Sequence, residues 1–98
     1  MVHIGGINSE LKQIILYSLK SAGFNAAICK KPGLQGIRPE NICNRCKTKT
    51  GVQLELSRGL RETLFDNLDH RFLRKKTIVF YQFVNTLRKV LELFCSEI

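Results

Sequence analysis

The stretch VHIGGINSELKQIILYSLKSAGFNAAI, residues 2–28, decides the fold. Its pattern predicts, in order, a strand over residues 2–4, a two-glycine turn, a helix over residues 9–22 and a strand over residues 24–28. Asn8 or Ser9 suits the N-cap of the helix, and Gly23 suits its C-terminal end. This order of elements predicts two parallel strands joined by a right-handed crossover.

The rest of the chain adds one strand and one long helix to this unit. Apolar and polar residues alternate in VQLELS, which predicts a strand over residues 52–57. Apolar residues recur in steps of four and three over residues 77–94, which predicts a helix that Thr77 caps. A shorter helix is expected to begin within residues 58–68, and a loop is expected over residues 30–41. We therefore expect one α/β domain with three parallel strands packed by helices.

Length and charge restrict the class of protein. The 98 residues allow one small domain, and 44% hydrophobic with 24% charged residues is the composition of a folding chain. Lys and Arg number 16 against 8 Asp and Glu, so the net charge of +8 favours a polyanionic partner, whether nucleic acid, an acidic membrane surface or a carboxylate polymer. Because no apolar stretch of about 18 residues and no secretory signal pattern is present, we expect cytoplasmic synthesis without a signal peptide and no membrane span.

Cys43 and Cys46 form a C-x-x-C pair, a spacing found in zinc sites and in redox motifs. A structural zinc site needs four ligands, and the remaining cysteines and histidines form no second closely spaced pair. A redox pair would begin a helix, whereas this pair lies between a loop and a predicted strand. An ordinary packed or surface position is expected for this pair and for the isolated side chains, Cys29, Cys95, His3 and His70.

Glu55 is the first candidate for chemistry, because it lies between two leucines on the predicted strand. If both faces of a parallel sheet are covered, burial raises the pKa of its carboxyl group, which can then act as a general acid or base. The alternative is a structural glutamate on an edge strand with its carboxylate in water. Three arginines flank the strand and can bind carboxylates through two parallel hydrogen bonds: Arg45, Arg58 and Arg61. A solvated basic face is the alternative for Arg61, Lys47 and Lys49.

Three blocks of sequence together resemble one known family. They are IGG-x-N-x-E-L-K at residues 4–12, P-x-N-I-x-N-R at residues 39–45 and G-V-Q-L-E at residues 51–55. In this order and spacing they resemble the phage-type poly-gamma-glutamate hydrolases of bacilli, their phages and their prophages. The resemblance is close over residues 2–61 and looser beyond. It implies an α/β fold, a partial zinc-carboxypeptidase-like mixed sheet with flanking helices, with residues 1–98 as the C-terminal part of an incomplete domain.

The resemblance also implies an activity and a set of site residues. The family hydrolyses gamma-glutamyl amide bonds of poly-gamma-glutamate with the help of zinc. By this likeness Glu55 is the catalytic residue that takes up the proton of the attacking water. Arg45, with Asn44 beside it, matches the position expected to bind a substrate carboxylate. The family's zinc ligands lie in an H-x-G-G-x-E segment and a later His-Gly, and this sequence contains neither, so no metal ligand is assigned here.

Two interpretations stay open, and with them the question whether the chain is itself an enzyme. In one, it is the C-terminal half of a prophage-derived hydrolase, truncated and inactive alone. In the other, a partner chain supplies the zinc ligands, or the chain is a non-catalytic basic module that binds an anionic polymer. Nucleic acid is the less favoured polymer, because no aromatic stacking platform or recognition helix is present. We expect self-association through an exposed sheet edge, and action outside the cell after lysis, as in the family.

Overall fold

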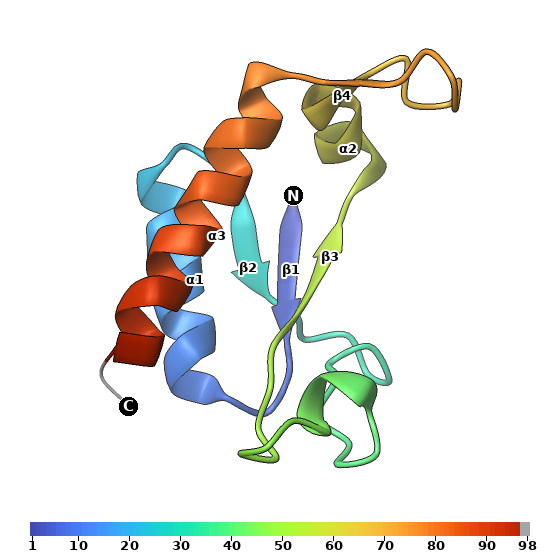
Figure 1. Ribbon diagram of the computed structural model, residues 1–98. Helices are drawn as coiled ribbons and strands as arrows, with labels where there is room; N and C mark the ends of the chain where they lie inside the picture. Colours follow the sequence, from blue (N-terminus) through green and yellow to red (C-terminus); the bar gives the residue numbers. More distant parts are fainter. Residues whose placement is uncertain (97–98) are drawn as a thin grey trace.

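A three-stranded sheet in the order β2-β1-β3 forms the centre of the structure (Figure 1). The computed structural model describes residues 1–96, with side chains through residue 94, so the packing expected for Cys95 lies outside the described side chains. The strands are β1 (Val2–Gly5), β2 (Ala26–Ile28) and β3 (Gln53–Leu56). β1 pairs in parallel with β2 and antiparallel with β3. The mixed sheet is confirmed, whereas the prediction of three parallel strands is wrong for β3.

β3 is antiparallel because the chain does not cross the sheet between β2 and β3. The C-terminal ends of the parallel strands β1 and β2 lie at the same end of the sheet. Residues 29–52 then form an irregular segment whose one regular element is the 3-10 turn η1 (Ile42–Asn44). This segment stays at that end of the sheet, where the N–H of Asn8 donates to the carbonyl oxygen of Gly51 at 3.1 Å. A third parallel strand would need a crossover connection, and residues 29–52 provide none.

Two glycines allow the chain segments at this end of the sheet to approach each other closely. Gly6 has a φ of +111°, and a Cβ atom there would lie 2.2 Å from the carbonyl oxygen of Gly51. A Cβ atom on Gly51 would in turn lie 1.5 Å from the carbonyl oxygen of Cys43. Only glycine fits either position, so the turn after β1, the start of β3 and η1 are in direct backbone contact.

Two helices cover one face of the sheet. α1 (Ser9–Ser21) begins at Asn8, whose Oδ1 accepts from the N–H of Leu11 at 3.0 Å, and α3 (Ile78–Ser96) packs against α1. The rings of Phe24 and Phe83 meet edge to face with centroids 5.3 Å apart. The buried cluster joins the sheet to both helices and consists of Val2, Ile4, Ile15, Leu19, Ala26, Leu64, Phe83 and Val90. The two long helices therefore lie where the apolar periodicity predicted them.

A short helix and a small hairpin connect β3 to α3. α2 (Arg58–Leu64) is capped by Ser57 and ends earlier than the predicted range of 58–68, because the chain turns into β4 (Phe65–Asp66). β4 pairs antiparallel with β5 (Lys75–Lys76), a hairpin that the sequence did not predict. None of the helices in the described part of the chain combines the length and hydropathy needed to cross a membrane.

Candidate functional site

Asn44, in η1, is the buried centre of the loop between β2 and β3. Its side chain is 1% exposed, and its amide makes four hydrogen bonds to backbone groups. Nδ2 donates to the carbonyl oxygens of Gly36 at 2.5 Å and Arg38 at 3.0 Å. Oδ1 accepts from the N–H groups of Ile7 at 3.2 Å and Gly51 at 3.0 Å. These bonds use the full capacity of the amide, so Asn44, predicted to bind substrate, holds three segments of the protein together.

Arg45 directly follows Asn44, and its side chain is exposed. Its N–H donates to the carbonyl oxygen of Ile42 at 3.2 Å, which closes η1 and fixes the backbone from which the guanidinium extends. Among the described side chains, no hydrogen bond or ion pair engages this guanidinium. Its five N–H donors are therefore available to a carboxylate from outside the described residues.

Glu55 lies on β3, which is an edge strand of the sheet. Leu54 and Leu56 pack against the core cluster, so the alternation of the strand turns Glu55 to the face opposite α1 and α3. Its side chain is exposed. The interpretation of a carboxylate buried between two covered faces is therefore wrong for these residues, and the edge-strand alternative describes its position.

His3 lies directly opposite Glu55, a relationship that the sequence did not reveal. The N–H of Ser57 donates to the carbonyl oxygen of Met1 at 3.0 Å, which makes Met1 and Ser57 a hydrogen-bonded pair. By the alternation of an antiparallel ladder, His3 and Glu55 are the next hydrogen-bonded pair, and their side chains share one face. The missing signals were the direction and the register of β3, because the local apolar pattern determines neither.

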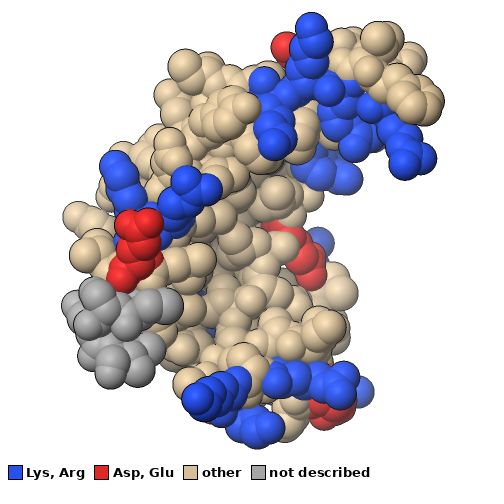
Figure 2. All heavy atoms as spheres, viewed as in Figure 1, with Lys and Arg blue, Asp and Glu red and all other residues tan. Residues whose placement is uncertain are grey.

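The three flanking arginines do not converge on one site. Arg45 precedes β3, while Arg58 and Arg61 follow it in α2, and a four-residue strand is roughly 13 Å long. Arg58 donates to Glu62 at 2.9 Å and to Asp69, and these carboxylates raise the pKa of its guanidinium. Lys and Arg gather over the η1 loop at one end of the molecule and over α2 and the β4–β5 hairpin at the other, with a smaller group on α3 (Figure 2).

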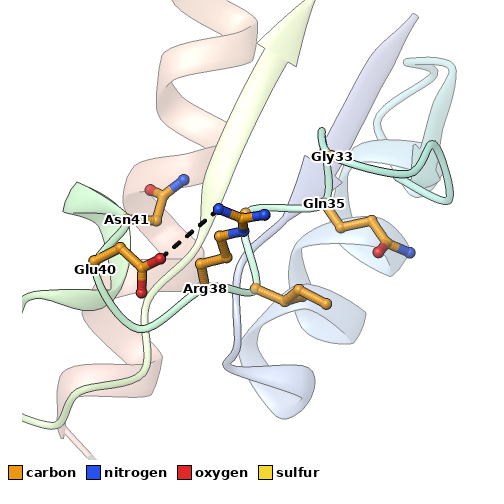
Figure 3. Close-up of a pocket in the computed structure, with 7 residues that line it drawn as sticks. Gly33, Gln35, Arg38, Glu40 and Asn41 are labelled. Carbon is orange, nitrogen blue, oxygen red and sulfur yellow. Dashed lines mark ion pairs between the residues drawn. The ribbon is translucent and has the colours of Figure 1, made fainter.

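A shallow hollow lies beside the Asn44 network. It has a volume of about 370 Å³ and is lined by residues of the loop after β2, including Gln35, Arg38 and Glu40. Figure 3 shows Arg38 and Glu40 turned toward each other, with Nη1 and Oε1 4.0 Å apart, while Gln35 extends away from this pair. Asn44 bonds to the backbone of this loop and thus sets the wall of the hollow. This hollow could not be predicted from the sequence, because the pattern of its lining residues indicates only turns.

The C-x-x-C pair does not form a metal site with the described residues. The thiol of Cys43 donates to the carbonyl oxygen of Gly36 at 3.7 Å, and that of Cys46 to the carbonyl oxygen of Thr50 at 3.4 Å. The neighbouring hydroxyl of Thr48 lowers the pKa of the Cys46 thiol. Within the described part of the chain, no group of three or more His, Cys, Asp or Glu side chains is placed to hold a metal ion.

Two curated proteins of Bacillus subtilis (strain 168) are similar to this chain. YmaC is 35% identical over 91 residues, which cover 91% of this chain and 39% of YmaC. YndL is 27% identical over 96 residues, which cover 93% of this chain and 37% of YndL. The chain therefore spans less than half the length of the curated relatives that it matches.

Two solved structures share the fold. The structure of a bacteriophage poly-gamma-glutamate hydrolase matches 99% of this chain and 47% of its own, with a TM-score of 0.84 and 28% identity. The apo, zinc-free structure of YndL matches 94% of this chain and 46% of its own, with a TM-score of 0.81 and 28% identity. The sequence model of the poly-gamma-glutamate hydrolase family matches residues 1–86. The chain therefore belongs to the poly-gamma-glutamate hydrolase family, as the three sequence blocks predicted.

Proposed function

We propose that these residues form the part of a poly-gamma-glutamate hydrolase that binds substrate and transfers the proton, with Arg45 and Glu55 as its working side chains. The observation that carries this proposal is the Asn44 network. Asn44 bonds to Gly51, two residues before β3, and directly precedes Arg45. One buried amide thus sets the position of the Arg45 backbone, from which the guanidinium extends, relative to the strand that bears Glu55.

The chemistry of the two side chains suits a gamma-glutamyl amide. Poly-gamma-glutamate carries one free carboxylate per residue, and the guanidinium of Arg45 can bind one through two parallel hydrogen bonds. The carboxylate of Glu55 accepts a proton from the water that attacks the amide carbonyl carbon. It then returns that proton to the amide nitrogen as the C–N bond breaks, which restores the carboxylate and releases an amine and a carboxylic acid.

Zinc dependence is part of the proposal for the family, and the existence of a form of YndL described as zinc-free supports it. The described residues do not fit a zinc site, because His3 and Glu55 form a pair and a catalytic zinc needs three protein ligands. The proposal is that the metal ligands lie outside these 98 residues, and that these residues alone hydrolyse no polymer.

A non-catalytic role is the second candidate. The net charge of +8 and the exposed guanidinium of Arg45 suit a module that binds an anionic polymer without cleaving it. In this case the substitution Glu55→Gln leaves binding unchanged and no added metal or partner yields hydrolysis. Binding of poly-gamma-glutamate that Arg45→Ala weakens is common to both candidates, so hydrolysis is what separates them.

The first test is incubation of the purified chain with poly-gamma-glutamate and zinc, with chain length followed by gel electrophoresis. The expected result is no shortening of the polymer. Shortening that disappears in Glu55→Gln would show that these residues are active alone and would overturn that part of the proposal.

The second test is a binding titration with poly-gamma-glutamate and with single-stranded DNA at matched charge and salt. Arg45→Ala is expected to weaken binding of poly-gamma-glutamate by roughly tenfold, because a charge-assisted hydrogen bond is lost. Arg88→Ala, which removes the same charge from the exposed surface of α3, is the matched control. If both variants lose the same affinity for both polymers, Arg45 contributes only its charge to binding.

A prophage origin and cytoplasmic synthesis, with access to the polymer after lysis, complete the proposal. The likeness to a bacteriophage hydrolase supports the phage origin. Cell fractionation before and after induced lysis tests the location, and the presence of the chain in the medium of intact cells would contradict it.

A further inference from the structure

A second hollow, the β2 hollow, lies at the outer edge of β2 and has a volume of about 670 Å³. All three residues of β2 line it, together with Leu16 of α1 and Pro32 of the loop that follows β2. These residues are apolar, so they offer a ligand a surface of aliphatic carbon atoms. The β2 hollow is larger than the hollow beside the Asn44 network and shares no lining residue with it.

Three lysines from two parts of the chain also line the β2 hollow. Lys20 lies in the last turn of α1, and Lys30 and Lys31 follow β2. All three are exposed, and no ion pair engages them among the described side chains. No described Asp or Glu lines the β2 hollow. Three positive charges without a paired carboxylate therefore surround an apolar surface, which suits an anion that also carries aliphatic groups.

Protection of an edge strand is the simpler role for such residues. Lysine and proline beside a terminal strand prevent it from pairing further, and this role accounts for Lys30, Lys31 and Pro32. It does not account for Lys20, which belongs to a helix. The helix dipole favours a cation in the last turn of α1 on any face, yet Lys20 lies on the face that borders β2. The convergence of these cations indicates a binding surface.

The β2 hollow adjoins the face of the sheet that bears Glu55. In the register of the sheet, His3 lies opposite Glu55 on one side and opposite Ala27 on the other. Residues in register share a face, so these three form one row across the face that α1 and α3 do not cover. His3 and Ala27 also line the β2 hollow. Two strand spacings, roughly 10 Å, separate the backbone of Glu55 from that of Ala27.

We propose that the β2 hollow is a second binding site for poly-gamma-glutamate, which holds the polymer beside the segment presented to Glu55. The inference rests on the proposed function and adds a site to it. Each residue of the polymer carries one carboxylate and has two methylene groups in its backbone. The lysines bind the carboxylates as point charges, and the aliphatic lining contacts the methylene groups.

Nucleic acid is the competing polyanion. Proteins bind single strands on aromatic side chains that stack with the bases, and no described Phe or Tyr lines the β2 hollow. The lining of β2 and Leu16 is aliphatic and matches the backbone of poly-gamma-glutamate better than the sugars and bases of a nucleic acid. These two considerations favour poly-gamma-glutamate.

The first test is a binding titration of the purified chain with poly-gamma-glutamate and with single-stranded DNA of matched charge, at about 0.15 M salt. Lys30→Gln combined with Lys31→Gln should weaken binding of poly-gamma-glutamate roughly tenfold. Lys75→Gln combined with Lys89→Gln removes the same charge from exposed positions outside the β2 hollow and should weaken it less than about twofold. For DNA the two double variants should lose affinity equally.

Lys20→Gln is the variant that separates binding from edge protection. Because this lysine belongs to α1, its loss should leave the sheet edge unchanged and weaken binding of poly-gamma-glutamate roughly threefold. Circular dichroism checks that each variant is folded, as expected for substitutions of exposed side chains. Unchanged affinity in Lys20→Gln would overturn the role of this residue in binding.

Amide chemical shifts measured by NMR locate the site on the chain. Addition of short chains of poly-gamma-glutamate should shift the amide signals of Ala27, Ile28 and Lys31. The amides of Asn85 and Arg88, on the exposed surface of α3, are the internal control and should not shift. Absence of shifts at β2, or equal shifts at β2 and α3, would overturn the inference.

The binding titrations also keep the two proposals apart. If the Lys30 and Lys31 variant loses affinity for poly-gamma-glutamate and Arg45→Ala does not, the proposed role of Arg45 fails and the β2 hollow stands. If Arg45→Ala loses affinity and the lysine variant does not, the β2 hollow fails and the proposed function stands. An equal loss for poly-gamma-glutamate and DNA in the lysine variant would overturn the assignment of the polymer.

Discussion

His3 and Glu55 are opposite each other in the backbone hydrogen-bond ladder of β1 and β3, and their side chains lie on the face of the sheet that α1 and α3 do not cover. The glutamate proposed to transfer protons thus has an imidazole as its cross-strand neighbour. The pairing depends on the antiparallel direction of β3, which places the two residues in register without any contact through the core.

Substitution of Glu55 should affect chemistry and leave the fold intact. Because the side chain is exposed, Glu55→Gln is expected to change the free energy of unfolding by less than about 0.5 kcal/mol. In an assay in which a partner chain supplies the metal ligands, loss of the base should reduce hydrolysis of poly-gamma-glutamate by roughly 100-fold or more. His3→Gln serves as the comparison and should reduce it less, since His3 acts only as a neighbour. A large loss of stability in Glu55→Gln would contradict this assignment.

Replacement of Asn44 should destabilise the whole loop. Asn44→Ala leaves the N–H groups of Ile7 and Gly51 without an acceptor and two carbonyl groups without a donor. The expected loss is roughly 2 to 4 kcal/mol in the free energy of unfolding, measured by urea denaturation. Asn85→Ala, on the exposed surface of α3, is the control and should change it by less than about 0.5 kcal/mol. Equal effects of the two substitutions would refute a structural role for Asn44.

Two glycine-to-alanine substitutions should have opposite effects. At Gly51 a Cβ atom would lie 1.5 Å from the carbonyl oxygen of Cys43, and the backbone must move to accept it. We expect a loss of about 3 kcal/mol or more. At Gly59, within α2, nothing lies within 4 Å of the added atom, and alanine should stabilise the helix by roughly 0.5 to 1 kcal/mol. Thermal denaturation of both variants tests the pair, and a stable Gly51→Ala would contradict the close approach.

Because of the ion pair of Arg58 and Asp69, the free energy of unfolding should depend on pH in the acid range. The guanidinium of Arg58 holds the pKa of the Asp69 carboxyl below its ordinary value of about 3.9. A carboxyl whose pKa is lowered by folding stabilises the folded state above that ordinary value, and this stabilisation is lost as the pH falls through the lower folded pKa.

Asp69→Asn should therefore reduce the fall in unfolding free energy as the pH is lowered from about 5 to about 2, measured by urea denaturation. Arg58→Met should have a similar effect, and the double variant should add little to either single change. Additive effects of the two changes would show that the pair does not act as a unit.

The isolated chain should self-associate weakly, and more strongly as salt is added. The free edge of β3 and exposed apolar side chains such as Phe72, which is 96% exposed, favour association, while the charge of +8 opposes it. Salt screens this repulsion over distances beyond about 10 Å at about 0.1 M. Sedimentation velocity at low and high salt measures the effect, and a monomer at both would contradict it.

The sequence was sufficient to predict the elements in which apolar residues recur with a regular period. The helices over Ser9–Ser21 and Ile78–Ser96 and the alternation around Glu55 follow from local apolar patterns. The direction of β3 could not be predicted, because it depends on the path of an irregular segment. The β4–β5 hairpin was missed for a similar reason: its two-residue strands are fixed by tertiary contacts, including a hydrogen bond from the N–H of Thr77 to the carbonyl oxygen of Leu64 at 2.9 Å.

The candidate site was predictable only in part. Arg45 and Glu55 were selected from the strand pattern and given their roles by the resemblance, and the structure leaves both accessible. The position of Asn44 was not predictable, because its four partners lie in separate segments of the chain and no periodic pattern connects them. The pairing of His3 with Glu55 was hidden for the same reason, since it spans more than fifty residues of sequence.

Under the proposed function, the buried amide of Asn44 also affects the thermodynamics of carboxylate binding at Arg45. A loop already fixed by four internal hydrogen bonds loses little conformational freedom when a carboxylate reaches Arg45. The unfavourable entropy of binding then comes mainly from the flexible polymer and from the side chain of Arg45 itself. Such preorganisation favours retention of a carboxylate that binds to Arg45.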